Sequence, residues 1–176
     1  PVSGGFHGAA PTRLLDTRTS GGCVTAPRSL AVAGLAGVPS DAGAVALNVT
    51  VTGASLPGFV VAWPAGAAMP TASTVNYVAG ETRANTTVVK VGSLGSVLLH
   101  ASAGCPHVVV DLVGWFAGGA PIAVGGIGAV TPYRVLDTRS PANREGCLRG
   151  YRAFTVAGVP GSGSMPAAAS RSRMSV

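Results

Sequence analysis

The chain has 176 residues, of which 47% are hydrophobic, 10% are charged and 26 are glycine. This composition excludes a chain disordered by charge, and its Gly and Pro content excludes long helices. The formal net charge of +6 does not indicate a nucleic-acid partner, because the excess lies in residues 132–176 and residues 1–131 are nearly neutral. A basic patch interleaved with aromatic residues is missing. The sequence contains no run of 18 uncharged apolar residues, so it predicts no membrane-spanning helix.

A repeated motif organises the chain. Pro11-Thr-Arg-Leu-Leu-Asp-Thr-Arg18 returns 121 residues later as Pro132-Tyr-Arg-Val-Leu-Asp-Thr-Arg139. This spacing predicts one complete unit over residues 1–120 and an incomplete second copy over 121–176. The strand pattern of the second copy dissolves into Ser and Arg near its end, and we interpret this as a frameshift or a premature stop. Its strands at 133–139 and 152–157 are expected to join a sheet edge, to pair with another chain or to stay mobile.

Short apolar runs punctuated by Gly and Pro predict strands throughout the first unit. Residues 45–52 alternate between apolar and polar side chains, as in a half-buried strand, whereas 108–116 is apolar on both faces and predicts a central strand. Gly92–Gly95 is expected to form a hairpin turn, and His7 to lie in a flexible lead-in. The sequence therefore predicts an all-β fold, an antiparallel β-sandwich of about eight short strands. The strands are expected at residues 12–18, 29–33, 45–52, 59–63, 74–78, 85–91, 96–102 and 108–116.

Asp111 requires a partner, because it lies among valines in the last strand and an unpaired buried carboxylate is costly. Arg13 and Arg18 are the candidate partners, since a guanidinium can bind a carboxylate through two hydrogen bonds. We therefore predict that the first and last strands are neighbours joined by a structural ion pair. Asp16, in contrast, is expected to accept hydrogen bonds from turn amides.

The three cysteines fit no zinc spacing. We predict a disulfide between Cys23 and Cys105, which would close most of the first unit and indicate an oxidising compartment. Cys147 lies in the matching loop of the second copy and has no partner assigned. The alternative is that all three cysteines are buried or idle thiols.

The sequence predicts no catalytic activity and no cofactor. It contains no metal-ligand spacing and no nucleophile elbow. Cys105 and His107 could form a nucleophile and a base, but no third group to orient the histidine is evident. A disulfide cysteine beside a bystander histidine is the simpler interpretation.

A ligand-binding face is the remaining functional candidate. Trp63 ends a strand before a long Ala/Pro loop, and Asn76, Tyr77 and Arg83 follow on the next segments. An aromatic ring beside amide and guanidinium donors is typical of a sugar-binding face. The alternative is that Trp63 fills the core.

Several blocks occur in a fixed order across residues 1–117: RLLDTR, ALNVTVTG, a strand ending in WP, VNYVAGET and VVDLVGWF. In this order they resemble a tandem repeat of secreted and cell-surface proteins of high-GC Gram-positive bacteria. The resemblance implies a secreted, non-catalytic module with a structural or adhesive role at the cell surface, and a cell-wall or other glycan as its partner. The alternatives are a carbohydrate-binding module and a structural subunit of a filament or virion, whose partners are copies of itself.

Overall fold

The computed structural model describes residues 4–119 together with Pro132, Arg134 and Asp137. The chain divides into two units, residues 1–131 and 132–176, and every strand in the described part belongs to the first. The strands predicted at 133–139 and 152–157 lie outside the described residues, apart from Arg134 and Asp137. Cys147 also lies outside them.

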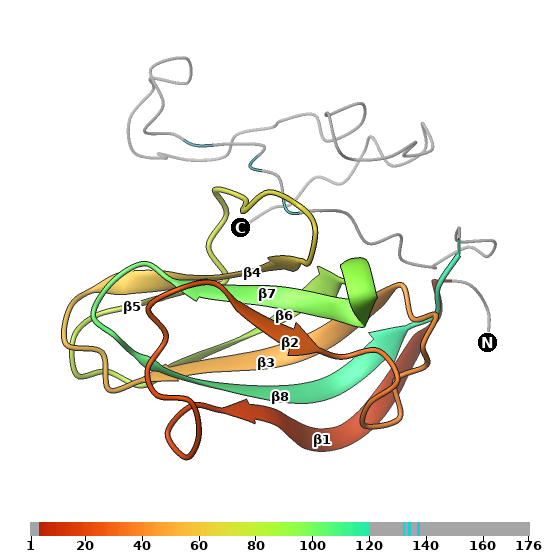
Figure 1. Ribbon diagram of the computed structural model, residues 1–176, viewed down its shortest axis with the longest axis horizontal. Helices are drawn as coiled ribbons and strands as arrows, with labels where there is room; N and C mark the ends of the chain where they lie inside the picture. The colour runs from red at the N-terminus through yellow and green to blue at the C-terminus, as the bar shows by residue number, and fades with distance from the viewer. Residues whose placement is uncertain (1–3, 120–131, 133, 135–136, 138–176) are drawn as a thin grey trace, which may run out of the picture. The chain divides into compact units, whose positions relative to one another are not determined.

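Two four-stranded antiparallel sheets face each other in the first unit (Figure 1). We call the sheet with the order β1-β8-β3-β6 sheet A, and the sheet with the order β2-β7-β4-β5 sheet B. The predicted all-β sandwich is confirmed. Its strands are β1 (Phe6–Asp16), β2 (Arg28–Ala31), β3 (Ala44–Thr52), β4 (Gly58–Pro64), β5 (Val75–Tyr77), β6 (Arg83–Lys90), β7 (Ser96–Ala101) and β8 (His107–Phe116).

The alternation in β3 explains how its sheet builds the core. Val45, Leu47, Val49 and Val51 have no exposed surface and belong to the core cluster. Because successive side chains of a strand point to opposite faces, Asn48 and its polar neighbours are directed to the outer face of sheet A. β3 and β8 are the two inner strands of this sheet, so the prediction of a central last strand is confirmed.

Two local predictions are wrong. The first strand begins at Phe6, and His7 is therefore part of β1, where its ring stacks on Trp115 with 4.1 Å between the ring centroids. The turn after β6 is not a hairpin. Residues Ser93–Gly95 form a 3-10 turn that carries the chain from β6 in sheet A to β7 in sheet B.

Candidate functional site

The first copy of the repeated motif lies along the contact between β1 and β8. Pairing begins with Phe6 opposite Phe116 and continues to Asp16 opposite Val109, with two register irregularities in β1. The predicted neighbourhood of the first and last strands is thus confirmed. The motif residues Arg13, Asp16 and Arg18 come at the end of this contact, where β1 turns away from the sheet.

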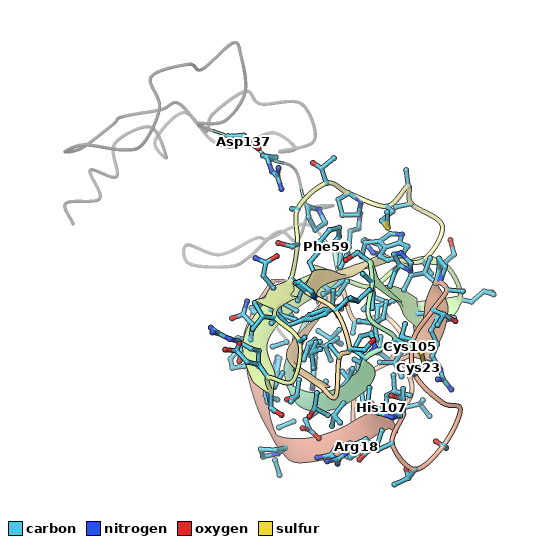
Figure 2. All side chains as sticks on the ribbon, turned by 90° about the vertical axis from the view of Figure 1, so that its left-hand side faces the viewer. Arg18, Cys23, Phe59, Cys105, His107 and Asp137 are labelled. Carbon is cyan, nitrogen blue, oxygen red and sulfur yellow. A yellow bond between two sulfur atoms is a disulfide. The ribbon has the colours of Figure 1, made fainter. Side chains whose placement is uncertain are left out.

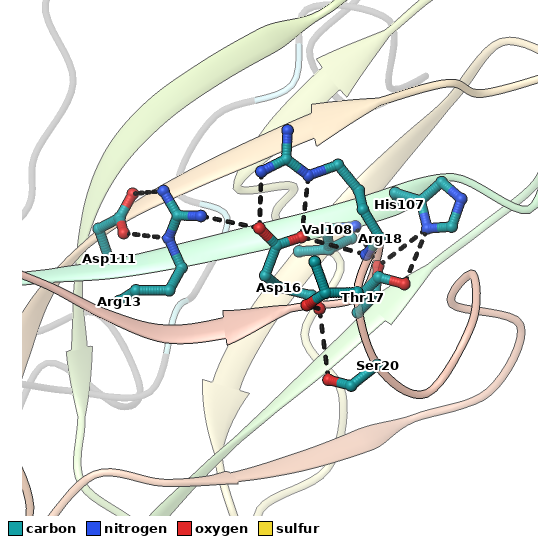
Figure 3. Close-up of polar contacts among 9 residues, drawn as sticks. Arg13, Asp16, Thr17, Arg18, Ser20, His107, Val108 and Asp111 are labelled. Atoms are coloured by element: carbon teal, nitrogen blue, oxygen red, sulfur yellow. Dashed lines mark hydrogen bonds and ion pairs between the residues drawn. The ribbon is translucent and has the colours of Figure 1, made fainter.

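Thr17 extends the contact by one residue with a side-chain hydrogen bond. Its backbone N–H donates to the Val108 carbonyl at 3.1 Å, and its Oγ1 accepts the Val108 N–H at 2.8 Å (Figure 3). The Thr17 hydroxyl thereby takes the place of a backbone carbonyl. Thr17 is only 1% exposed, and Nδ1 of His107 lies 3.0 Å from its carbonyl oxygen.

Two arginines and two aspartates form a connected network on the outer face of sheet A (Figure 3). Arg13 binds Asp111 through Nε and Nη2 and reaches Asp16 Oδ2 through Nη1 at 2.8 Å. Arg18 binds the two carboxylate oxygens of Asp16, at 2.9 Å and 2.6 Å. The predicted pair of Arg13 with Asp111 is therefore present. The prediction that Arg18 contributes to binding Asp111 is wrong, because the turn after β1 directs its side chain back onto Asp16.

Asp16 combines this ion pairing with the turn role predicted for it. Its Oδ1 accepts the Arg18 N–H at 3.1 Å, and its backbone carbonyl accepts the N–H groups of Thr19 and Ser20. The hydrogen bonds from the Arg18 side chain, followed by its backbone hydrogen bond and by the charges of Arg18 and Arg13, hold the pKa of Asp16 well below its ordinary value. The Asp16 carboxylate is therefore ionised throughout the physiological range, which suits a structural anion.

The second copy of the motif forms the same local ion pair. Arg134 Nη1 lies 2.9 Å from Asp137 Oδ2, and Arg13 Nη1 lies 2.8 Å from Asp16 Oδ2 in the first copy. Both pairs are separated by three residues along the chain. The spacing within the motif therefore produces this pair in both places.

Cys23 and Cys105 form a disulfide beyond the end of the β1–β8 contact (Figure 2). The bridge links residues 82 apart in the sequence, and its formation agrees with the prediction. The Val24 N–H donates to the Pro106 carbonyl at 2.9 Å beside it. Because Cys105 is disulfide-bonded, it cannot act as a nucleophile with His107.

The four residues predicted for a sugar-binding face do not share an open surface. Trp63 is only 3% exposed, and its indole N–H donates to the Ala67 carbonyl. Tyr77 is 4% exposed and belongs to the core, with its hydroxyl donating to the Ala103 carbonyl. Asn76 is exposed, and Arg83 forms an ion pair with Glu81. Neither aromatic ring is open to a ligand. The position of Trp63 therefore agrees with the alternative prediction, in which it fills the core.

Within residues 4–119, and at the three described positions beyond them, no group of three or more His, Cys, Asp or Glu side chains is placed to hold a metal ion. The same residues include no helix with the length and hydropathy of a membrane span.

Two features of this region escaped the sequence prediction. Thr17 was not recognised as a buried side chain, although its place in both copies of the Asp-Thr-Arg motif was a usable signal. Asn48 is one of the polar residues in the alternating pattern of 45–52, and its presence there is a further signal, because asparagine is depleted in strands. It lies on the outer face of sheet A beside the network.

Comparison with known proteins adds no further assignment. No protein-family model matches the chain, and no curated protein matches it in sequence.

Proposed function

We propose that the chain is a non-catalytic extracellular module with a structural or adhesive role at a cell surface. The observation that carries this proposal is that the charged side chains of the repeated motif form structural ion pairs. The charged side chains of its first copy bind one another and Asp111, and so hold β1 against β8. A motif used in this way specifies a stable building block, which is what a surface protein made of tandem units requires.

The disulfide supports the extracellular part of the proposal. Disulfides persist in oxidising environments and are rare in the cytosol. The bridge between Cys23 and Cys105 encloses six of the eight strands. It would allow the sandwich to keep its fold outside the cell, where chaperones are scarce.

Cosedimentation with whole Gram-positive cells tests the adhesive role. The purified 176-residue chain, labelled with a fluorophore, is mixed with cells and with isolated cell walls, and the pellets are measured. We expect saturable retention in both pellets. A chain that stays in the supernatant, and whose Cys23 and Cys105 are reduced when it is isolated from its source, would contradict the proposal.

A further inference from the structure

The outer face of sheet A carries a row of polar residues, one from each strand. The register places Arg13 of β1 beside Asp111 of β8, Asp111 beside Asn48 of β3, and Asn48 beside Thr86 of β6. Residues opposite each other in neighbouring strands direct their side chains to the same face. With strands about 4.8 Å apart, the row extends over about 14 Å. Figure 3 shows the Arg13–Asp111 end of this row.

Asn48 is an unusual residue at the centre of such a row. Asparagine is depleted in strands because its side chain packs poorly and competes for backbone hydrogen bonds. Here it lies in the middle of an inner strand and is half-buried. Among the described residues, its amide has no side-chain hydrogen bond or ion pair. The amide therefore presents two N–H donors and one carbonyl acceptor to whatever lies outside the sheet.

Thr86 adds a second polar group at the β6 end of the row. Its side chain is exposed, and no described residue forms a hydrogen bond with its hydroxyl. Asn48 and Thr86 lie directly opposite each other. Together they offer amide and hydroxyl groups on neighbouring strands, a pair able to bind two vicinal hydroxyl groups.

Charge on this part of the face is balanced. Arg13 and Arg18 are matched by Asp16 and Asp111 in the network described above. β6 adds one charged side chain to this face, Lys90, which lies opposite Ala44 at the far end of the strand. A balanced face gives no electrostatic advantage to a polyanion or to a cation, so a neutral ligand fits it best.

An apolar strip borders the row on one side. Val88 is 43% exposed and lies opposite Ala46, while Val113 is half-buried at the bulge of β8. Ligand sites combine apolar contact with a few polar groups that fix orientation. A sugar ring has both kinds of surface, with hydroxyl groups around its edge and C–H groups on its faces.

We propose that the row Arg13, Asp111, Asn48 and Thr86 is a binding site for a neutral, extended oligosaccharide. This inference rests on the proposed surface role and names the class of its partner. The Asn48 amide in the middle of the row and the Thr86 hydroxyl at its β6 end bind ring hydroxyls, and Val88 contacts a ring face. The site differs from the face around Trp63 and Tyr77 predicted from sequence, whose aromatic rings are buried.

Affinity electrophoresis in gels containing soluble polysaccharides tests the proposal. The full chain is run against neutral dextran, mannan, galactan and xylan, with heparin and polygalacturonate as charged probes. The variants are Asn48→Ala and Thr86→Val, both of which remove polar groups that have no partner within residues 4–119. Asn76→Ala is the matched control, because Asn76 is an exposed asparagine on a strand of the other sheet. Thermal unfolding verifies that each variant is folded.

We expect at least one neutral polysaccharide to retard the wild-type chain. Asn48→Ala and Thr86→Val should each weaken that binding about tenfold, the effect of losing about one good hydrogen bond. Asn76→Ala should bind as the wild type does. Retardation by the charged probes alone, no retardation by any neutral probe, or equal binding by Asn48→Ala would each overturn the proposal.

Cell cosedimentation separates this inference from the surface role. Retention of the wild type and Asn48→Ala to the same extent would overturn the oligosaccharide site and leave the surface role standing. Loss of retention in Asn48→Ala alone would support both. A wild-type chain that binds a neutral polysaccharide in the gel but no cells supports the site and contradicts the adhesive role.

Discussion

Thr17 Oγ1 accepts the Val108 N–H at 2.8 Å, although Thr17 lies one residue past the end of β1. The reciprocal backbone hydrogen bond, from the Thr17 N–H to the Val108 carbonyl, is 3.1 Å long. The two bonds continue the ladder between the first and last strands by means of a side chain. Since Val108 has no exposed surface, its N–H has no access to water as a substitute partner.

Replacing Thr17 with valine is therefore expected to destabilise the fold by about 1–3 kcal/mol, the cost of leaving a buried N–H unsatisfied. Thr17→Ser keeps the oxygen and should cost about 1 kcal/mol, through the lost methyl group. Urea unfolding at equilibrium measures both. Equal losses for the two variants would show that the hydroxyl is not what matters.

The pair of Arg13 with Asp111 should contribute modestly. Their side chains are 47% and 21% exposed, and solvent and salt weaken an ion pair at such positions. A double-mutant cycle with Arg13→Ala and Asp111→Ala should give a small but measurable coupling free energy, because the contact involves two hydrogen bonds. The matching cycle of Arg18→Ala with Asp111→Ala should give no coupling, since Arg18 binds Asp16.

Removing the disulfide should have the largest effect. Cys23→Ser combined with Cys105→Ser opens a loop spanning 82 residues, and the chain-entropy relation gives a loss of about 4 kcal/mol. Chemical unfolding of the double variant measures the loss. Cys147→Ser is the control and should leave the first unit unchanged. A double variant as stable as the wild type would show that the two sheets alone suffice.

Stability should fall in acid because of Asp16. Its pKa in the fold lies below the ordinary value of 3.8, so the unfolded chain binds protons more readily than the folded chain does. The stabilisation is complete above the unfolded pKa and is lost as the pH falls through the folded pKa. Unfolding free energy should therefore begin to decline below about pH 5. Asp16→Asn should flatten this decline, and an unchanged slope would contradict the assignment.

Leu94 offers a stabilising substitution. Its backbone has φ of 56° and its side chain is 99% exposed, so it bears left-handed strain and buries nothing in return. Asparagine tolerates this conformation better, and Leu94→Asn is expected to raise the unfolding free energy by about 0.5–1 kcal/mol. Leu56→Asn is the control, an exposed leucine without a positive φ, and should change stability little. A loss of stability in Leu94→Asn would contradict the strain argument.

Local pattern in the sequence determined the strands of this protein. The alternation of residues 45–52 and the apolar run of 108–116 predicted β3 and β8 closely, because side-chain direction in a strand repeats every two residues. The need of Asp111 for a cation predicted that β1 and β8 are neighbours, since burying a charge without a partner is costly whatever the fold. Cys23 and Cys105 are the two cysteines of the complete first unit, and this predicted the bridge between them.

The tertiary structure alone decided which side chains meet. Arg13 and Arg18 are equivalent candidates in the sequence, and only the turn after β1 assigns one to Asp111 and the other to Asp16. The 3-10 turn after β6 sends β7 to the other sheet, which no local pattern of glycines specifies. Trp63 is closed off by a contact with Ala67 in its own loop, and Asn48 meets Asp111 and Thr86 only through register. The pair of Arg13 with Asp111 and the neighbours of Asn48 depend on contacts between segments distant in the chain. Such contacts produce no periodic pattern in the sequence from which they could be predicted.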